Sequence, residues 1–304
     1  MRSGHLDRRL LAVAVALLID RWTPEPPNRW HPVAWFGTSM TAVEQRIWAD
    51  RRAAGLIYTG AGVAIGVAAG RLVRSPTAAL AVALGAGSLR ATAAEIGEVV
   101  DGGDLPAARR SVRALVGRDP SELDEAGIAA AVVESVAENS VDATVAPIFW
   151  TLVAGAPGAL GYRAVNTMDA MVGHRSTRYE RFGWASARLD DVANWLPARL
   201  FACGVVVAAW PRRREILNAI RADAPAHPSP NAGVAEAAVA GALGVELGGP
   251  LRYGDRLENR PRLGTGPRPD AAAIVGTNSL VDRVLLGIGA AAVGVRIARR
   301  FRSR

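Results

Sequence analysis

The sequence predicts an all-α, polytopic membrane protein with about five or six apolar helices, joined by polar helices and loops. The first observation behind this prediction is composition. Hydrophobic residues make up 50% of the chain before its 32 glycines are counted, and mean hydropathy is +0.15. A soluble domain reaches roughly 45–50% apolar only with glycine included. The other two observations are the repeated apolar segments and the scarcity of β-type alternation. A soluble helical protein is the alternative left open.

Six apolar segments follow one another along the chain, at residues 10–19, 55–73, 77–89, 143–160, 196–210 and 280–298. Only residues 55–73 approach the ~20 apolar residues that cross a bilayer. The others are shorter or carry a charge, such as Arg199 or Arg283. Arginines flank both ends of several segments, so the orientation is not fixed. We predict one multi-pass domain over residues 1–304, located in the cell membrane (inner or plasma).

Polar segments separate the apolar ones. Residues 106–117 and 121–142 are predicted helices, and Asp119, Pro120 and Ser121 resemble the start of the second one, with Asp124 three residues on. Residues 22–32, 222–231 and 248–270 are predicted loops, because proline and glycine are frequent there. Long loops in a compact protein are usually functional or disordered, and we expect these three to be functional.

The charged residues exclude several mechanisms. All 36 basic residues are arginines, which leaves no lysine for a P-loop or a Schiff base. Any phosphate is therefore held by arginine, metal or backbone amides. The net charge of +8 is scattered among apolar runs, so we predict no nucleic-acid binding. Cys203 stands alone, which excludes a disulfide framework and a cysteine metal site.

The first candidate cluster lies at the end of the helix predicted over residues 121–142. Glu134, Glu138 and Asp142 are spaced i, i+4, i+8, so they share one stripe, with Asn139 beside it. Like charges at this spacing repel, and a divalent cation or an arginine would relieve the repulsion. A solvated helix face is the alternative.

The second cluster combines oxygen ligands with arginines. Asn166 and Asp169 lie i, i+3 on one face, and His174, Arg175 and Arg178 follow. Magnesium prefers hard oxygen ligands and phosphate suits the forked guanidinium, so the combination is typical of a magnesium-phosphate site. A lone histidine such as His174 is more often structural.

The third cluster lies at the mouth of an apolar segment. Asp190 and Asn194 are spaced i, i+4, and Asp191 adds a second acid that is costly near lipid unless it is paired or metal-bound. Structural pairs of these acids with Arg188 or Arg199 are the alternative.

A fourth element is Asn231, a good helix N-cap beside amides that could bind an anion.

We expect the clusters to converge on one site. The predicted catalytic residues are Glu138, Asp142, Asp169, Asp190 and Asp191, with Glu138, Asp142 and Asp190 as metal ligands; the predicted substrate- or phosphate-binding residues are Asn139, Asn166, His174, Arg175, Arg178, Arg188, Asn194 and Asn231.

These stretches, in this order, resemble the motifs of the adenosylcobinamide-phosphate synthase family of cobalamin biosynthesis. The matching text is His31-Pro32-Val33, Glu138-Asn139 with Asp142, Asn166-Thr-Met-Asp169-Ala-Met-Val-Gly173, Phe182-Gly-Trp-Ala-Ser-Ala-Arg188-Leu-Asp190-Asp191-Val-Ala-Asn194 and Ser229-Pro-Asn231-Ala-Gly233. The resemblance covers roughly residues 10–265, and the run from Tyr162 to Arg199 is its most specific part. One departure is an aspartate that the family usually has ahead of His31-Pro32-Val33; Glu25 lies in that region and is left outside the site.

The resemblance implies an integral-membrane ligase that uses ATP and Mg²⁺. Such an enzyme joins a propionate carboxyl of the corrinoid adenosylcobyric acid to aminopropanol phosphate or free aminopropanol. A complex with other cobalamin-assembly enzymes is compatible with the resemblance and is not fixed by the sequence.

Two other functions are compatible with the residues alone. A magnesium-dependent membrane prenyltransferase would also place aspartates at helix ends. It would carry two similar aspartate-rich motifs, however, and Asn166-Thr-Met-Asp169 resembles Asp190-Asp191-Val-Ala-Asn194 only poorly. A transporter or assembly subunit would place its charges in mid-span, whereas these acids lie mainly at segment ends.

Overall fold

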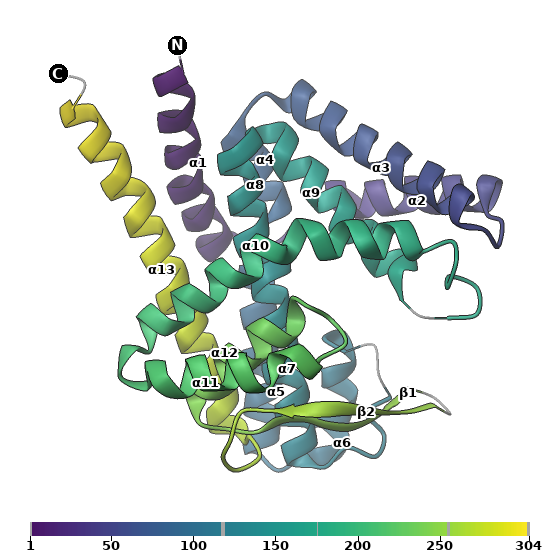
Figure 1. Cartoon of the computed structure of the whole chain (residues 1–304), viewed down its shortest axis with the longest axis vertical. Helices are drawn as coiled ribbons and strands as arrows, with labels where there is room; N and C mark the ends of the chain where they lie inside the picture. Colours follow the sequence, from purple (N-terminus) through teal and green to yellow (C-terminus); the bar gives the residue numbers. More distant parts are fainter. Residues whose placement is uncertain (1, 117–118, 175, 254–255, 303–304) are drawn as a thin grey trace. The chain divides into compact units, whose positions relative to one another are not determined.

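The structure is a computed structural model that describes residues 2–116, 119–174, 176–253 and 256–302, without the side chains of residues 2–3 and 250–259. Helices make up most of it, and one two-stranded sheet is the β-structure found in these residues (Figure 1). This confirms the predicted helical fold class. The chain divides into two compact units. Unit 1 comprises Met1–Gly87, Asp142–Pro197 and Gly289–Arg304, and unit 2 comprises Ser88–Val141 and Ala198–Ile288. The prediction of a single domain over residues 1–304 stays a prediction.

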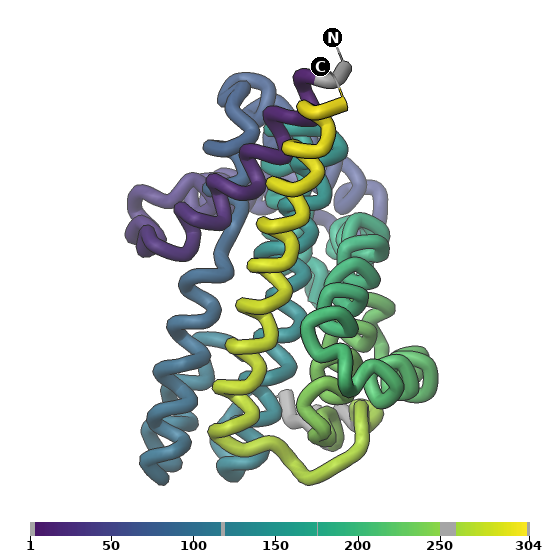
Figure 2. The backbone as a smooth tube through the Cα atoms, turned by 90° about the vertical axis from the view of Figure 1, so that its left-hand side faces the viewer, coloured from purple at the N-terminus to yellow at the C-terminus, as the bar shows by residue number. Residues whose placement is uncertain are grey.

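Unit 1 is built from both ends and the middle of the chain. Its elements are α1 (Arg2–Trp22), η1 (Asn28–Trp30), α2 (Pro32–Ile47), α3 (Arg52–Val73), α4 (Pro76–Ala83), η3 (Val141–Val145), α8 (Ala146–Ala154), α9 (Ala156–Met168), η4 (Asp169–Gly173), the first part of α10 (Trp184–Ala208) and the last part of α13 (Ala271–Arg302). The first turns of α1 and the last turns of α13 lie side by side (Figure 2). The Arg299 Nε atom of α13 pairs with the Asp7 Oδ1 atom of α1 at 3.1 Å.

Helices α3 and α9 approach each other closely within unit 1. A Cβ atom on Gly66 would lie 2.7 Å from the Leu160 carbonyl oxygen, and one on Gly70 would lie 2.4 Å from the Pro157 Cα atom. Real Cβ contacts are never this short, so the packing needs glycine at both positions. Small residues that let helix backbones approach in this way are typical of membrane proteins.

Unit 2 is a second group of helices with a hairpin. Its elements are α5 (Ala86–Asp101), α6 (Leu105–Ser111), η2 (Val112–Ala114), α7 (Glu125–Ser140), the end of α10, η5 (Trp210–Arg212), α11 (Arg213–Ala222), η6 (Ala224–Ala226), α12 (Ala232–Leu243), β1 (Leu247–Tyr253), β2 (Arg256–Leu263) and the first part of α13. Helix α12 is rich in alanine and glycine and is buried on nearly all sides, against α7 and α11. Its small side chains allow this, since a Cβ atom on Gly241 would lie 2.6 Å from the Ile216 Cα atom of α11.

The structure differs from the prediction in three segments of unit 2. Part of the predicted loop at residues 248–270 is an antiparallel hairpin, β1 with β2, whose register shifts between Leu247 and Gly249. Helix α7 begins at Glu125 rather than near Ser121, because Asp124 is its N-cap and accepts the Gly127 N–H at 2.7 Å. The predicted helix at residues 106–117 is shorter and consists of α6 and η2.

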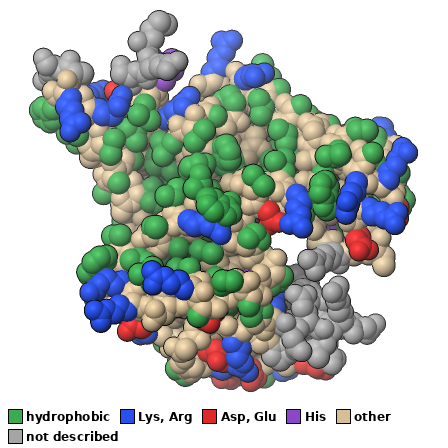
Figure 3. All heavy atoms as spheres, viewed as in Figure 1, with side chains coloured by type: hydrophobic (Ala, Val, Ile, Leu, Met, Phe, Trp, Pro, Cys, Tyr) green, Lys and Arg blue, Asp and Glu red, His purple; other side chains and the backbone are tan. Residues whose placement is uncertain are grey.

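Within the residues that the structure describes, three helical stretches are long and apolar enough to cross a membrane: Arg52–Val73, Pro76–Asp101 and Trp184–Ala208. Large apolar side chains of α3 face outward, and Leu72 is 82% exposed. Figure 3 shows many more hydrophobic side chains on the visible surface. Large apolar side chains exposed along such helices suit contact with lipid. The chain is therefore a helical membrane-type protein, and the number of passes and the plasma membrane as its location stay predictions.

A pair of substitutions in α3 tests the close packing with α9. We expect Gly70→Ala to lower the apparent unfolding temperature of the detergent-solubilised protein, because overpacking costs about 1–3 kcal/mol. Gly60→Ala is the control, since a Cβ atom there meets nothing within 4 Å and alanine favours a helix. Equal unfolding temperatures for the two variants would contradict the packing described.

Candidate functional site

Two π-helical segments carry two of the predicted catalytic acids. Asp142 lies in η3 and Asp169 is the first residue of η4. Single π-helical turns are rare inside α-helical structure and are frequent at functional sites. The predicted stripe of Glu134, Glu138 and Asp142 is therefore not one regular α-helical face, because α7 ends at Ser140 and the wider π turn changes the direction of Asp142.

The half-buried Asp142 is held by residues of α9. The Asn166 Nδ2 atom donates to the Asp142 Oδ2 atom at 3.1 Å, and the Arg163 Nη1 atom donates to the Asn166 Oδ1 atom at 3.3 Å. Burial lowers the pKa of Arg163, and Tyr162, Glu25 and Asp142 oppose this shift. The guanidinium remains charged, as arginine does in proteins. It supplies a buried positive charge beside the acid.

Asp190 is held in a similar way by an amide. The Asn194 Nδ2 atom donates to the Asp190 Oδ2 atom at 2.9 Å, and the Tyr162 hydroxyl donates to the Asn194 Oδ1 atom at 2.8 Å. Burial raises the pKa of Tyr162 well above its usual value, and Asp142 and Asp190 raise it further, so the hydroxyl keeps its proton. Tyr162 thereby fixes the orientation of the Asn194 amide towards the acid.

The two groups belong to one network within unit 1. Asp190 interacts with Asn166 and lies near Asp169 as well as Asn194. We call this set the acid–amide cluster; its members are Asp142, Tyr162, Arg163, Asn166, Asp169, Asp190 and Asn194. The structure thus brings together five of the predicted site residues, and it adds Tyr162 and Arg163, which the sequence analysis did not select.

Gly173 permits the position of Asp169. A Cβ atom on Gly173 would lie 1.8 Å from the Asp169 Oδ1 atom, so no other residue fits here without moving the carboxylate. The next segment is packed just as tightly, because a Cβ atom on Gly183 would lie 1.7 Å from the Val172 carbonyl oxygen.

Glu25 is a further acid of this region. It belongs to the loop at residues 22–32, and its charge acts on the buried Arg163. Its Oε1 atom would lie 3.2 Å from a Cβ atom on Gly85. The signal that could have identified it was available in the sequence: an acidic residue in a proline-rich loop ahead of His31-Pro32-Val33.

The predicted phosphate-binding residues after η4 have protein partners. Both Nε and Nη2 of Arg178 donate to the Glu44 Oε1 atom, at 3.2 and 2.9 Å, and the Tyr179 hydroxyl donates to the same oxygen at 2.9 Å. The hydrogen bond to Glu44, followed by the interaction with Tyr179, raises the pKa of Arg178. His174 packs edge-on against the Tyr179 ring. These contacts attach the segment to α2, and phosphate binding by His174 and Arg178 stays a prediction.

Two further predicted residues, Arg188 and Asp191, pair with each other. Arg188 lies 3.5 Å from Asp191 on the outer side of α10, which is the pair that the sequence analysis gave as the alternative. Arg175 lies outside the described residues. The roles predicted for Arg188, Asp191 and Arg175 stay predictions.

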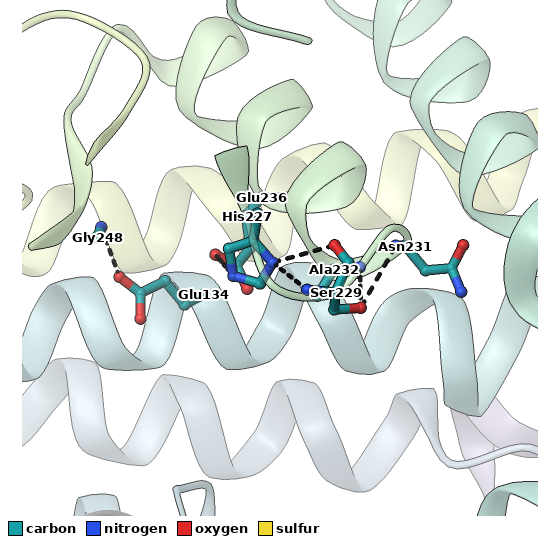
Figure 4. Close-up of polar contacts among 7 residues, drawn as sticks. All are labelled: Glu134, His227, Ser229, Asn231, Ala232, Glu236 and Gly248. Atoms are coloured by element: carbon teal, nitrogen blue, oxygen red, sulfur yellow. Dashed lines mark hydrogen bonds and ion pairs between the residues drawn. The ribbon is translucent and has the colours of Figure 1, made fainter. Parts of the chain in front are cut away.

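In unit 2, α7 contributes one buried and one exposed acid. Glu134 is buried, and its Oε1 atom accepts the Gly248 N–H of β1 at 2.9 Å (Figure 4). Glu138, one turn later, is exposed. The Asn139 Nδ2 atom donates to the Ser135 carbonyl oxygen of its own helix at 2.8 Å. Glu134 therefore anchors the hairpin, and the roles predicted for Glu138 and Asn139 stay predictions.

A buried histidine organises the turn before α12. The Ser229 N–H donates to the His227 Nδ1 atom at 3.1 Å, and the His227 Nε2 atom lies 3.7 Å from the Glu236 Oε2 atom (Figure 4). The His227 and Glu236 side chains are only 3% and 1% exposed. The His227 Nδ1 atom also lies 3.1 Å from the Ser229 carbonyl oxygen, so both backbone polar groups of Ser229 face this ring nitrogen. Neither residue is among the site residues predicted from the sequence, although both flank Asn231.

Asn231 lies at the predicted N-cap position of α12, and anion binding there stays a prediction. The Ser229 Oγ atom caps α12 by accepting the Ala232 N–H at 3.2 Å, while the Asn231 side chain makes no capping bond. The Asn231 Oδ1 atom accepts instead from the Arg199 Nη1 atom at 2.9 Å. Arg199 of α10 thus has a polar partner, which a charge in an apolar segment needs.

The donor set can be compared with what magnesium requires. In the described part of the chain, no three His, Cys, Asp or Glu side chains are grouped so that they could hold a metal ion by themselves. Glu138, Asp142 and Asp190 as a complete ligand set stay a prediction. Magnesium in nucleotide sites, however, is usually held by one or two carboxylates together with water and substrate phosphates. The carboxylate and amide oxygens of the acid–amide cluster fit that requirement.

Comparisons with known proteins identify similar sequences. Residues 13–281 match the family described as CobD/Cbib protein. The chain is 44% identical to the cobalamin biosynthesis protein CobD of Mycobacterium tuberculosis over 99% of this chain and 100% of that one. It is 43% identical to CobD of Chromobacterium violaceum, over 90% and 92% of the two chains, and 42% identical to a CobD of Rhodobacter capsulatus, over 85% and 87%. No solved structure matches the chain.

Two buried tyrosines of unit 1 test the hydrogen bond to Asn194. We expect Tyr162→Phe to lower the stability of the detergent-solubilised protein by about 1–3 kcal/mol, because the Asn194 oxygen loses its donor in a buried place. Tyr58→Phe is the control, because the partner that the described residues give the Tyr58 hydroxyl is the Met171 sulfur at 3.9 Å, a weak acceptor. Denaturant titrations of both variants measure the difference. A Tyr162→Phe protein as stable as the Tyr58→Phe protein would contradict the described role.

Proposed function

The chain belongs to the CobD/CbiB protein family and is an enzyme of cobalamin biosynthesis, and from this premise we propose that it converts adenosylcobyric acid to adenosylcobinamide or its phosphate. The amine substrate is aminopropanol or aminopropanol phosphate, and ATP drives formation of the amide bond. The acid–amide cluster of unit 1 is the observation that carries this proposal, because it gathers partly buried carboxylate and amide oxygens and a guanidinium in a membrane-type protein.

The proposed reaction has two steps. A propionate oxygen of the corrinoid attacks the γ-phosphorus of ATP, the bond from that phosphorus to the bridging oxygen breaks, and ADP leaves. The amine nitrogen then attacks the acyl carbon, the bond from that carbon to the phosphate oxygen breaks, and inorganic phosphate leaves while the nitrogen loses a proton. Magnesium, when bound with the nucleotide, would neutralise phosphate charge in the first step.

The residues of the acid–amide cluster support this chemistry through charge and orientation. Asp142 and Asp190 are the carboxylates that would face a nucleotide-bound cation, and each is held in place by an amide, Asn166 or Asn194. The chain has no lysine, so a guanidinium such as that of Arg163 is the cation available for developing phosphate charge. Groups fixed before the reaction stabilise charge without reorganising.

The packing around η4 supports the same proposal. The Gly173 backbone lies directly against the Asp169 carboxylate, with no space for a side chain between them. The bond network of Glu44 with Arg178 and Tyr179 holds the segment that follows against α2. A site that forms an acyl phosphate must exclude water, and a rigid segment of this kind serves that purpose.

The family favours this proposal over the alternatives left open by the residues. A magnesium-dependent prenyltransferase or a transporter would not account for a match to cobalamin biosynthesis proteins over nearly the whole chain. The choice between free and phosphorylated amine, the multi-pass arrangement in the plasma membrane and a complex with other cobalamin-assembly enzymes remain parts of the proposal.

Substitutions in the acid–amide cluster test the proposed reaction. The detergent-solubilised protein is incubated with adenosylcobyric acid, ATP and magnesium, with either amine, and the amide is quantified by mass spectrometry. We expect Asp190→Asn and Asp142→Asn each to lower the rate by roughly 10²-fold or more, because each removes a charge that is preorganised for the phosphoryl-transfer step.

Asp101→Asn is the matched control, because Asp101 is exposed at the end of α5 in unit 2. It should keep the wild-type rate. Amide formation without ATP, or full activity of both cluster variants, would contradict the proposal, as would a folded wild-type protein that makes no amide from either amine.

A further inference from the structure

The connection from α10 to α11 carries a concentrated basic surface. Arg212, Arg214 and Arg221 are exposed, and Trp210 is 57% exposed at the start of η5. The guanidinium of Arg213 lies 5.0 Å from the Trp210 ring centroid, in cation–π contact. Basic and apolar side chains also lie together on the lower left of Figure 3, where Figure 1 draws α11. We call Trp210, Arg212, Arg213, Arg214 and Arg221 the basic surface of α11.

The charges of this surface are not compensated by the protein. Glu215 is the one acid between Trp210 and Arg221. Among the residues that the structure describes, no ion pair engages Arg212, Arg214 or Arg221. A partner of this surface must therefore be anionic.

The apolar side of α11 is already used, which leaves its charged side outward. Ile216 and Ala219 are buried, and Gly241 of α12 touches the backbone at Ile216. Apolar groups remain exposed beside the arginines, since Val207 is 72% and Leu217 is 37% exposed. The partner surface must then accept apolar side chains as well as positive charge.

We propose that the basic surface of α11 binds the anionic phospholipid headgroups of a bilayer. A tryptophan and several arginines directly after an apolar helix form the pattern of the membrane–water interface, where aromatic rings lie at the headgroup level and arginines meet lipid phosphates. Helix α10, which ends at Ala208, is one of the three helices long and apolar enough to span a bilayer. The basic surface begins two residues later, at the depth where the headgroups of that bilayer would lie.

Lipid binding at this surface would act on the rest of unit 2. Helix α11 packs on α12, which carries Glu236. The last turn of α11 leads to Asp223. The Asp223 Oδ2 atom accepts the Gly264 N–H at 2.8 Å, which fixes the chain after β2. A headgroup layer that immobilises α11 would thereby steady α12 and the end of the hairpin. The proposal is independent of the reaction assigned above.

A fluorescent label on α11 tests the proposal in the full-length protein. Cys203 is first replaced by alanine, Leu217→Cys is added, and the thiol is coupled to an environment-sensitive dye. The protein is reconstituted into vesicles of phosphatidylcholine alone or mixed with phosphatidylglycerol, with the same composition in both leaflets so that orientation does not matter. We expect the dye emission to shift to shorter wavelength and to be shielded from an aqueous quencher in the anionic vesicles.

Two double substitutions separate this surface from general charge effects. Arg212→Gln with Arg214→Gln should abolish the shift, whereas Arg110→Gln with Arg113→Gln, two exposed arginines elsewhere in unit 2, should leave it intact. Identical spectra in both kinds of vesicle would overturn the proposal, and so would an equal shift in the two double variants. Inorganic phosphate added to phosphatidylcholine vesicles should have no effect; if it reproduced the shift, the surface would be a phosphate site rather than a bilayer-binding one.

Discussion

The folded structure of unit 1 depends on pairing polar side chains that apolar helices bury. Three carboxylates, two amides, a tyrosine and an arginine meet in the acid–amide cluster, and each would be costly in such surroundings without a partner. Asn166 serves Asp142, and Asn194 serves Asp190. Tyr162 and Arg163, neighbours on α9, then bond the two amides. Folding and the proposed chemistry therefore depend on the same hydrogen bonds.

Glycine makes this pairing geometrically possible. The cluster residues come from η3, α9, η4 and α10, and α9 can lie against α3 only because Gly66 and Gly70 have no side chains. Gly173 similarly leaves space for the Asp169 carboxylate. In a membrane, where apolar side chains gain little by leaving lipid, such close contacts and buried hydrogen bonds hold helices together. The many small residues of the chain thus position the polar ones.

The sequence predicted the helical fold class and five members of the acid–amide cluster, because oxygen-bearing residues at helical spacing next to apolar segments leave a clear local pattern. It could not predict Tyr162 or Arg163, whose roles depend on contacts between distant segments. The stripe through Glu134 and Asp142 was expected on a regular helix, and the π-helical turn of η3 changed it. Asn231 lies at the N-cap position that its residue type predicted, but its side chain accepts a hydrogen bond from Arg199. The Ser229 Oγ atom makes the capping bond instead. The hairpin was not predicted because glycine, proline and arginine interrupt the alternation of apolar and polar residues that is typical of strands.

The central claim is that the acid–amide cluster is where a metal-bound nucleotide meets the chain. Metal-directed cleavage tests it most directly: ferrous iron replaces magnesium with ATP on the solubilised protein, peroxide and ascorbate cut the backbone near the metal, and the fragments are mapped by mass spectrometry. The account predicts ATP-dependent cuts around Asp142, Asp169 and Asp190 that excess magnesium suppresses. Cuts confined to other segments, or cuts unchanged by Asp142→Asn and Asp190→Asn, would contradict it.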